Sequence, residues 1–132
     1  MPILATGMVE TGFTPLSADQ AAGSILTRVA ITKRFSGSLE AEGSGEMLSA
    51  VTGAGSSAFV AIERISGSLH GRRGSFVLQH SGTVTREAMQ YTVQVVPDTG
   101  TGELAGLSGS MRVHQVDGRQ SYEFEYSLPD SR

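Results

Sequence analysis

The fold is decided by the stretch Gly71-Arg72-Arg73-Gly74-Ser75-Phe76-Val77-Leu78-Gln79-His80-Ser81-Gly82, which has the pattern of a turn followed by a strand. Residues 57–70, which precede it, mirror its alternation of apolar and small polar residues. A period of two is typical of a half-buried strand. The two segments therefore predict one long β-hairpin with its turn at Arg72-Arg73.

This hairpin brings an acidic and a basic side chain together. With the turn at Arg72-Arg73, the expected register places Ile65 opposite His80 and Glu63 opposite Gly82. Glu63 then lies diagonal to His80 on one face of the sheet. Diagonal neighbours are about 7–8 Å apart, within reach of long side chains. The sequence leaves open which face is interior, because Val60 and Ile62 make the opposite face apolar as well.

The rest of the chain extends the strand pattern. Asp117-Gly118 is a strong signal for a two-residue hairpin turn. About eight strands without a convincing helix predict one domain, residues 1–132, with an all-β fold. We expect an antiparallel eight-stranded barrel, because closure removes exposed strand edges. The expected strands outside the hairpin are 3–13, 24–35, 38–51, 89–96, 104–116 and 119–128; the expected turns and loops are 14–23, with one possible helical turn at 18–22, and 52–57, 83–87 and 97–102.

Composition excludes several functions. A net charge of −3 provides no basic excess for nucleic acid, and the absence of cysteine excludes disulfides and thiolate chemistry. No apolar run approaches the ~18 residues of a membrane span, and the N-terminus lacks a signal-peptide pattern. We therefore expect a cytoplasmic protein with no nucleic-acid or membrane partner.

Three segments together resemble a known family. They are 71–82, Glu63-Arg64-Ile65-Ser66-Gly67 and Gly100-Thr101-Gly102-Glu103-Leu104-Ala105-Gly106-Leu107-Ser108-Gly109. Over nearly the whole chain the sequence is similar to a bacterial family of small proteins, domain of unknown function 3224. Its members are described as barrels like allene oxide cyclase, in the calycin-like group, and residues 100–109 also resemble a segment of the plant cyclases and dirigent proteins. The resemblance implies a barrel but no activity, and the cyclases' functional residues have no matching positions here.

Glu63 and His80 are the first candidates for chemistry. Inside an apolar barrel they would be polar anchors for a ligand or a general acid–base pair, because burial raises a carboxyl pKa and an adjacent imidazole can share its proton. The alternative is a structural hydrogen-bonded pair, or a pair that faces solvent if the face assignment is inverted.

Other polar residues are weaker candidates for ligand binding. Tyr91, Tyr122 and Tyr126 share the apolar face of their strands, where their hydroxyls would orient a ligand or, more commonly, lie at the rim of a packed core. Arg72 and Arg73 would bind an anion at the barrel mouth, although arginines in turns are usually solvated. A polar outer face is expected for Arg28, Arg64, Arg112 and His114.

No metal site or cofactor is expected. His70, His80 and His114 lack the paired spacing that places two ligands together, and no cysteine assists them. The glycine-rich residues 98–102 precede a strand pattern without Gly-Lys-Ser/Thr, so they indicate a turn and not a phosphate-binding loop.

Three functions remain open. The first is a barrel that binds a small apolar or amphipathic molecule in its lumen. The second is an isomerase or cyclase that uses Glu63 and His80 as acid and base. The third is an interaction module with a filled barrel, which we expect to be a homo-oligomer because Val60, Ile62, Val95 and Val96 make both strand faces apolar. The expected ligand-binding residues are Phe59, Glu63, Phe76, Leu78, His80, Tyr91, Phe124 and Tyr126.

Overall fold

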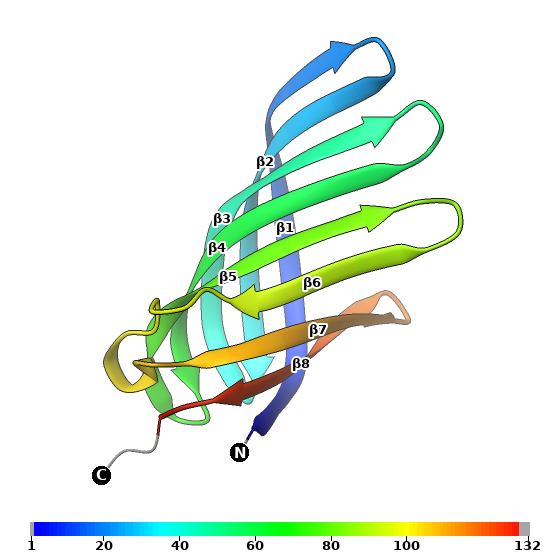
Figure 1. Ribbon diagram of the computed structural model, residues 1–132. Coiled ribbons are helices and arrows are strands. Elements are labelled where there is room, and N and C mark those ends of the chain that lie inside the picture. The colour runs from blue at the N-terminus through cyan, green and yellow to red at the C-terminus, as the bar shows by residue number, and fades with distance from the viewer. Residues whose placement is uncertain (1, 130–132) are drawn as a thin grey trace.

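The strands form a closed barrel (Figure 1). Because successive side chains of a strand point to opposite faces, one face of every strand lies inside the barrel. The computed structural model describes residues 2–129. All neighbouring strands pair antiparallel in sequential order, and β1 pairs with β8 to close the barrel. The expected fold class is thus confirmed. The elements are β1 (Ile3–Ala21), β2 (Ser24–Gly37), β3 (Leu39–Thr52), β4 (Ser57–Leu69), β5 (Arg72–Val84), β6 (Met89–Val95), the 3₁₀ turn η1 (Gly102–Leu104), β7 (Ser108–Val116) and β8 (Arg119–Ser127).

The two ends of the barrel differ. At the end where β1 begins and β8 finishes, η1 packs beside β5, and Leu104 is buried there. At the other end, the β1–β2, β3–β4 and β5–β6 hairpins extend beyond the shorter β7–β8 hairpin (Figure 1). We call these the closed end and the open end. Among residues 2–129, no helix is long and apolar enough to cross a membrane.

The β4–β5 hairpin has a different register from the one expected. Its turn lies at His70-Gly71, whose φ angles of 47° and 83° are both positive, as a two-residue hairpin turn requires. Arg72 and Arg73 therefore belong to β5 and not to the turn. Ile65 pairs with Phe76 instead of His80. The pairing is shifted by four residues, an even number, so every side chain keeps its face.

Two other expectations were wrong. Residues 14–21 were expected to be a loop, with one helical turn possible at 18–22. They instead continue β1 along β2, with a register irregularity between Pro15 and Ser17. The backbone groups of the long β2 supply partners that composition does not reveal, and Pro15 is tolerated because this part of β1 is an edge. The strand expected from residue 104 begins only at Ser108, because η1 precedes it.

The closed end is packed solid by side chains. Phe76 stacks on Phe124 with ring centroids 5.8 Å apart, and Phe124 lies 5.4 Å from Tyr126. All three side chains are buried. Leu69 and Leu39 are also buried beside them in the same core. This end of the lumen is a hydrophobic core with no space for a ligand.

The structure also decides which strand face is interior. Glu63 and Ile65 point inward, whereas Val60 and Ile62 are each 52% exposed on the outside. The expected polar outer face is also found: Arg28 pairs with Glu46, and His114 lies 3.1 Å from Glu123.

Candidate functional site

A lysine, a glutamate and a histidine from three strands meet inside the barrel. Lys33 lies on β2, Glu63 on β4 and His80 on β5. Lys33 Nζ donates to Glu63 Oε2 at 2.8 Å, and His80 Nε2 bonds to the same oxygen. The side chain of Glu63 has no solvent exposure, and those of Lys33 and His80 are only 11% and 10% exposed. The contact expected between Glu63 and His80 is present despite the shifted register, because Ala61 and not Ile65 pairs with His80.

Glycines on β3 make this meeting possible. Lys33 pairs with Gly43, and Gly45 pairs with Glu63. A Cβ at Gly43 would lie 3.4 Å from Glu63 Oε1, and a Cβ at Gly45 would lie 2.0 Å from the carbonyl oxygen of Ile62. Since β3 has no side chain at these positions, Lys33 reaches across it from β2 to β4.

Electrostatics keep Glu63 ionised. Burial alone would raise the pKa of its carboxyl, but the hydrogen bond from His80 and the positive charge of Lys33 outweigh burial and hold the pKa below its usual value. An ionised carboxylate only accepts hydrogen bonds. His80 must therefore donate from Nε2, which leaves its Nδ1 without a partner among the hydrogen bonds of residues 2–129.

One oxygen of Glu63 remains unsatisfied. Within the described part of the chain, Oε1 is the only fully buried side-chain polar atom without a hydrogen-bond partner. Such an atom costs free energy unless a donor reaches it. The site therefore retains hydrogen-bonding capacity that the protein itself does not use.

A cavity of about 230 Å³ lies above the cluster at the open end. Lys33 and His80 form its polar part, while most of the other lining side chains are apolar. The lining residues are Val9, Thr11, Phe13, Ile31, Lys33, Phe35, Met47, Phe59, Ala61, His80, Tyr91, Val93, Val113 and Gln120.

Side-chain hydrogen bonds close the cavity where strand pairing ends. β6 and β7 share one backbone pair, Gln94 with Ser110. Beyond it, the Tyr91 hydroxyl donates to the carbonyl of Val113 at 2.9 Å and accepts from its N–H at 3.2 Å. On the other side of the β7–β8 hairpin, Thr11 Oγ1 donates to Gln120 Oε1 at 3.1 Å. The cavity wall therefore depends on a few side chains at these two seams.

The expected ligand-binding residues divide into two groups. Phe59, His80 and Tyr91 line the cavity, and Glu63 lies behind Lys33 and His80. The remaining four lie in the core that fills the barrel below the cavity: Phe76, Leu78, Phe124 and Tyr126.

The other two tyrosines have structural partners. The Tyr122 hydroxyl accepts from the N–H of Leu39 at 2.9 Å and donates to the carbonyl of Ser36, while burial raises its pKa. The Tyr126 hydroxyl lies 2.6 Å from His70 Nδ1, and burial also raises its pKa. Both hydroxyls thus bond to groups at or beside the turns of the closed end.

Lys33 is the site residue that the sequence reasoning missed. Its signal was available, since Lys33 shares the strand face of Val29, Ile31 and Phe35. A lone lysine on the apolar face of a strand either reaches solvent or has a buried partner. The sequence could not name that partner, because Glu63 lies two strands away.

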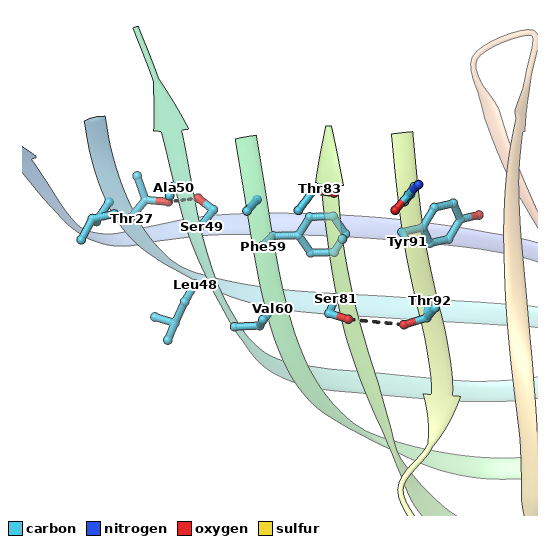
Figure 2. A pocket seen from close by; sticks show the side chains of 14 residues that line it. Thr27, Leu48, Ser49, Ala50, Phe59, Val60, Ser81, Thr83, Tyr91 and Thr92 are labelled. Carbon is cyan, nitrogen blue, oxygen red and sulfur yellow. Dashed lines mark hydrogen bonds between the residues drawn. The ribbon is translucent and has the colours of Figure 1, made fainter. Parts of the chain in front are cut away.

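A second hollow crosses the free ends of β2 to β6 (Figure 2). It has a volume of about 730 Å³. Figure 2 shows Leu48 and Val60 on one side of the strands and the rings of Phe59 and Tyr91 on the other. A Cβ at Gly82 would lie 2.8 Å from the Phe59 ring, so glycine makes room for that ring. We call this hollow the outer groove; its other lining residues are Leu26, Thr27, Ser49, Ala50, Ala58, Ser81, Thr83, Gln90 and Thr92.

Fold and site together define a small closed antiparallel barrel with a buried ionic cluster beneath an open cavity. The family model described as "Protein of unknown function (DUF3224)" matches residues 5–126. The chain belongs to this family, as its sequence pattern indicated. It is also 42% identical to a protein of unknown function from the DUF3224 family of Shewanella oneidensis MR-1, whose crystal structure it matches with a TM-score of 0.94 over 99% of this chain and 100% of that one. No curated protein matches the sequence.

Proposed function

We propose that the protein binds a small amphipathic molecule in the cavity at the open end of the barrel. The observation that carries this proposal is the contrast within the cavity: its walls are largely apolar, and Lys33 and His80 supply polar atoms at one place. Ligand sites in proteins commonly combine an apolar lining with a few convergent polar groups.

The size of the cavity limits the ligand. Its 230 Å³ is below the roughly 300–1,000 Å³ of pockets that hold drug-sized molecules. The core of the closed end blocks deeper entry, because Phe76, Phe124 and Leu78 fill the lumen there. We therefore expect a short apolar body that lies between Phe59, Val93 and Phe35, with its polar group toward Lys33 and His80.

Native mass spectrometry of the purified protein, followed by a denatured spectrum, tests the proposal. We expect a small retained mass that disappears on denaturation. Ala61→Phe should abolish retention because it fills the cavity from β4, whereas Ala58→Phe adds the same ring to the outer face of the same strand and should leave retention unchanged. An empty protein that binds none of added 1-octanol, octanoate and octylammonium would contradict the proposal.

Proton-transfer catalysis is a second candidate function. It is favoured by the hydrogen bond between His80 Nε2 and the ionised Glu63, because a carboxylate that fixes one imidazole nitrogen leaves the other available as a base. An isomerase would use His80 Nδ1 in this way. Once a retained molecule is identified, Glu63→Gln should remove its turnover and leave its affinity nearly unchanged. Equal losses of turnover and affinity would indicate a structural role.

Self-association is a third candidate, favoured by the apolar side chains of the outer groove. Leu26, Leu48 and Val60 are 49%, 54% and 52% exposed. Contiguous exposed apolar surface commonly marks an interface. Sedimentation equilibrium of the protein and of Leu48→Glu/Val60→Glu tests this candidate: the wild type should be oligomeric and the variant monomeric, and a monomeric wild type would exclude it.

A further inference from the structure

In the described part of the chain, the ionic cluster leaves two polar groups without partners on residues that line the cavity. Lys33 Nζ makes one hydrogen bond among residues 2–129, to Glu63 Oε2, so two of its three N–H groups remain available. His80 Nδ1 is the other free group, since Nε2 is engaged with the same oxygen of Glu63. Both residues line the cavity, whereas Glu63 lies behind them. A polar group that enters the cavity therefore meets a donor from Lys33 and an acceptor on His80.

The charge of the cluster restricts what can bind. Lys33 and the ionised Glu63 sum to zero when His80 is neutral. An anion that entered alone would leave one uncompensated negative charge in a largely apolar site, which is costly. A proton that arrives on His80 with the anion restores neutrality. A carboxylic acid satisfies both requirements, because one oxygen accepts from Lys33 while the other shares its proton with His80.

From this arrangement we propose that the ligand is a small monocarboxylic acid with an apolar tail, bound together with one proton shared with His80 Nδ1. The inference rests on the proposed binding function and adds the chemical class of the ligand. A carboxylate is preferred to an alcohol because charge-assisted hydrogen bonds are about twice as strong as neutral ones. An ammonium head group is disfavoured by Lys33.

The surroundings of His80 support its role as the proton acceptor. Glu63 on β4 and Lys33 on β2 are the charged groups inside the barrel, and Tyr91 on β6 is the other titratable group of the cavity. Outside the barrel, Arg28 and Glu46 pair with each other beside a shallow hollow that His80 also borders. Glu63 Oε2, bonded to His80 Nε2, is the carboxylate oxygen in contact with the ring that would share the proton of the ligand.

Three probes with one tail test the head group: octanoate, 1-octanol and octylammonium, titrated by calorimetry. We expect octanoate to bind roughly tenfold or more tightly than 1-octanol, as an added hydrogen bond to a charged group implies. We expect no measurable binding of octylammonium. Titrations of octanoate at pH 8 in phosphate and in Tris, whose ionisation enthalpies differ, should report uptake of about one proton per ligand.

Paired variants test whether Lys33 causes the preference for octanoate over 1-octanol. Lys33→Met/Glu63→Gln removes both charges together, so that neither is left buried alone, and should bind octanoate and 1-octanol equally. Arg34→Met is the matched control, because Arg34 lies on the outer face of the same strand, paired with Glu42. This control should preserve the preference for octanoate. His80→Phe should eliminate the proton uptake.

The outcomes separate this inference from the proposed function. Equal binding of octanoate and 1-octanol by the wild type would overturn the carboxylic-acid assignment and retain an amphiphile site. Preferential binding of octylammonium would show that Glu63 and not Lys33 selects the head group, and would also overturn it. Octanoate binding without proton uptake would remove His80 from the assignment. If none of the three probes binds, the proposed function itself fails.

Discussion

The closed end and the open end of the barrel are built by the same strands and differ in what fills them. At the closed end, Phe76, Phe124 and Tyr126 are at most 3% exposed. At the open end, Phe13 is 61% exposed and Tyr91 is 36% exposed. Between them lies the cluster of Lys33, Glu63 and His80. The barrel therefore has a core on one side of a polar layer and a cavity on the other.

This difference separates the packed core from the proposed binding site along the barrel axis. Large aromatic side chains fill the lumen where β1 pairs with β8 and η1 packs against β5. Backbone pairing stops between β6 and β7 at the open end, and side-chain hydrogen bonds replace it. The closed end can thus maintain the fold, and the open end contains the cavity in which we propose that a ligand binds.

The largest expected effect compares one phenylalanine from each end. Phe76→Ala should lower the free energy of unfolding by about 3–5 kcal/mol, because it creates a cavity in a packed core. Phe13→Ala should change it by no more than about 0.5 kcal/mol, as expected for an exposed side chain. Urea unfolding followed by circular dichroism measures both. Equal losses for the two variants would mean that the ends are not distinct in packing.

The polar layer between the ends should be the next most sensitive region. Lys33→Met leaves the buried Glu63 without its cation and should cost about 3 kcal/mol. Arg34→Met, which removes an exposed ion pair, should cost little. Lys33→Met/Glu63→Gln should regain much of the loss in the same unfolding experiment. No difference between Lys33→Met and Arg34→Met would show that the buried ion pair does not contribute to stability.

The third comparison is between two glycines, of which Gly45 pairs with Glu63 of the polar layer. Gly45→Ala should lower the free energy of unfolding by about 1–3 kcal/mol, because its Cβ would overlap the backbone of β4. Gly53→Ala, in the turn between β3 and β4 with no atom within 4 Å of the added Cβ, should be neutral or stabilise by up to about 1 kcal/mol. Thermal unfolding of the two variants checks the contrast; a stable Gly45→Ala protein would imply that β3 can move away from β4.

The smallest expected effect is a change in the free energy of unfolding at acidic pH. The pKa of Glu63 is lower in the folded protein than its ordinary value of 4.5, so the unfolded chain binds a proton here more readily than the folded one. This stabilisation is fully present above about pH 4.5 and is lost as the pH falls through the lowered pKa. Unfolding free energies measured from pH 6 to pH 3 should therefore fall less steeply for Glu63→Gln than for the wild type. Parallel curves would mean that Glu63 does not titrate differently in the two states.

Sequence alone determined the class of fold and two of the three residues of the ionic cluster. The period-two pattern of residues 57–82 and the Asp117-Gly118 turn are local signals, and local signals are sufficient to predict strands and hairpins. The same parity argument brought Glu63 and His80 to one face of one hairpin. It survived a four-residue error in register, because a shift by an even number of residues does not change the face of a side chain.

Tertiary structure decided the rest. It selected the inner face, extended β1 through residues 14–21, filled the closed end with Phe76, Phe124 and Tyr126, and left the cavity at the open end. It also brought Lys33 to Glu63 across the glycines of β3, a contact between residues 30 positions apart on strands that are not neighbours. A pattern along the chain encodes which way each side chain points from its strand. Only closure of the barrel determines which of the inward side chains meet, because that depends on strand curvature and on the volumes of residues far away in sequence.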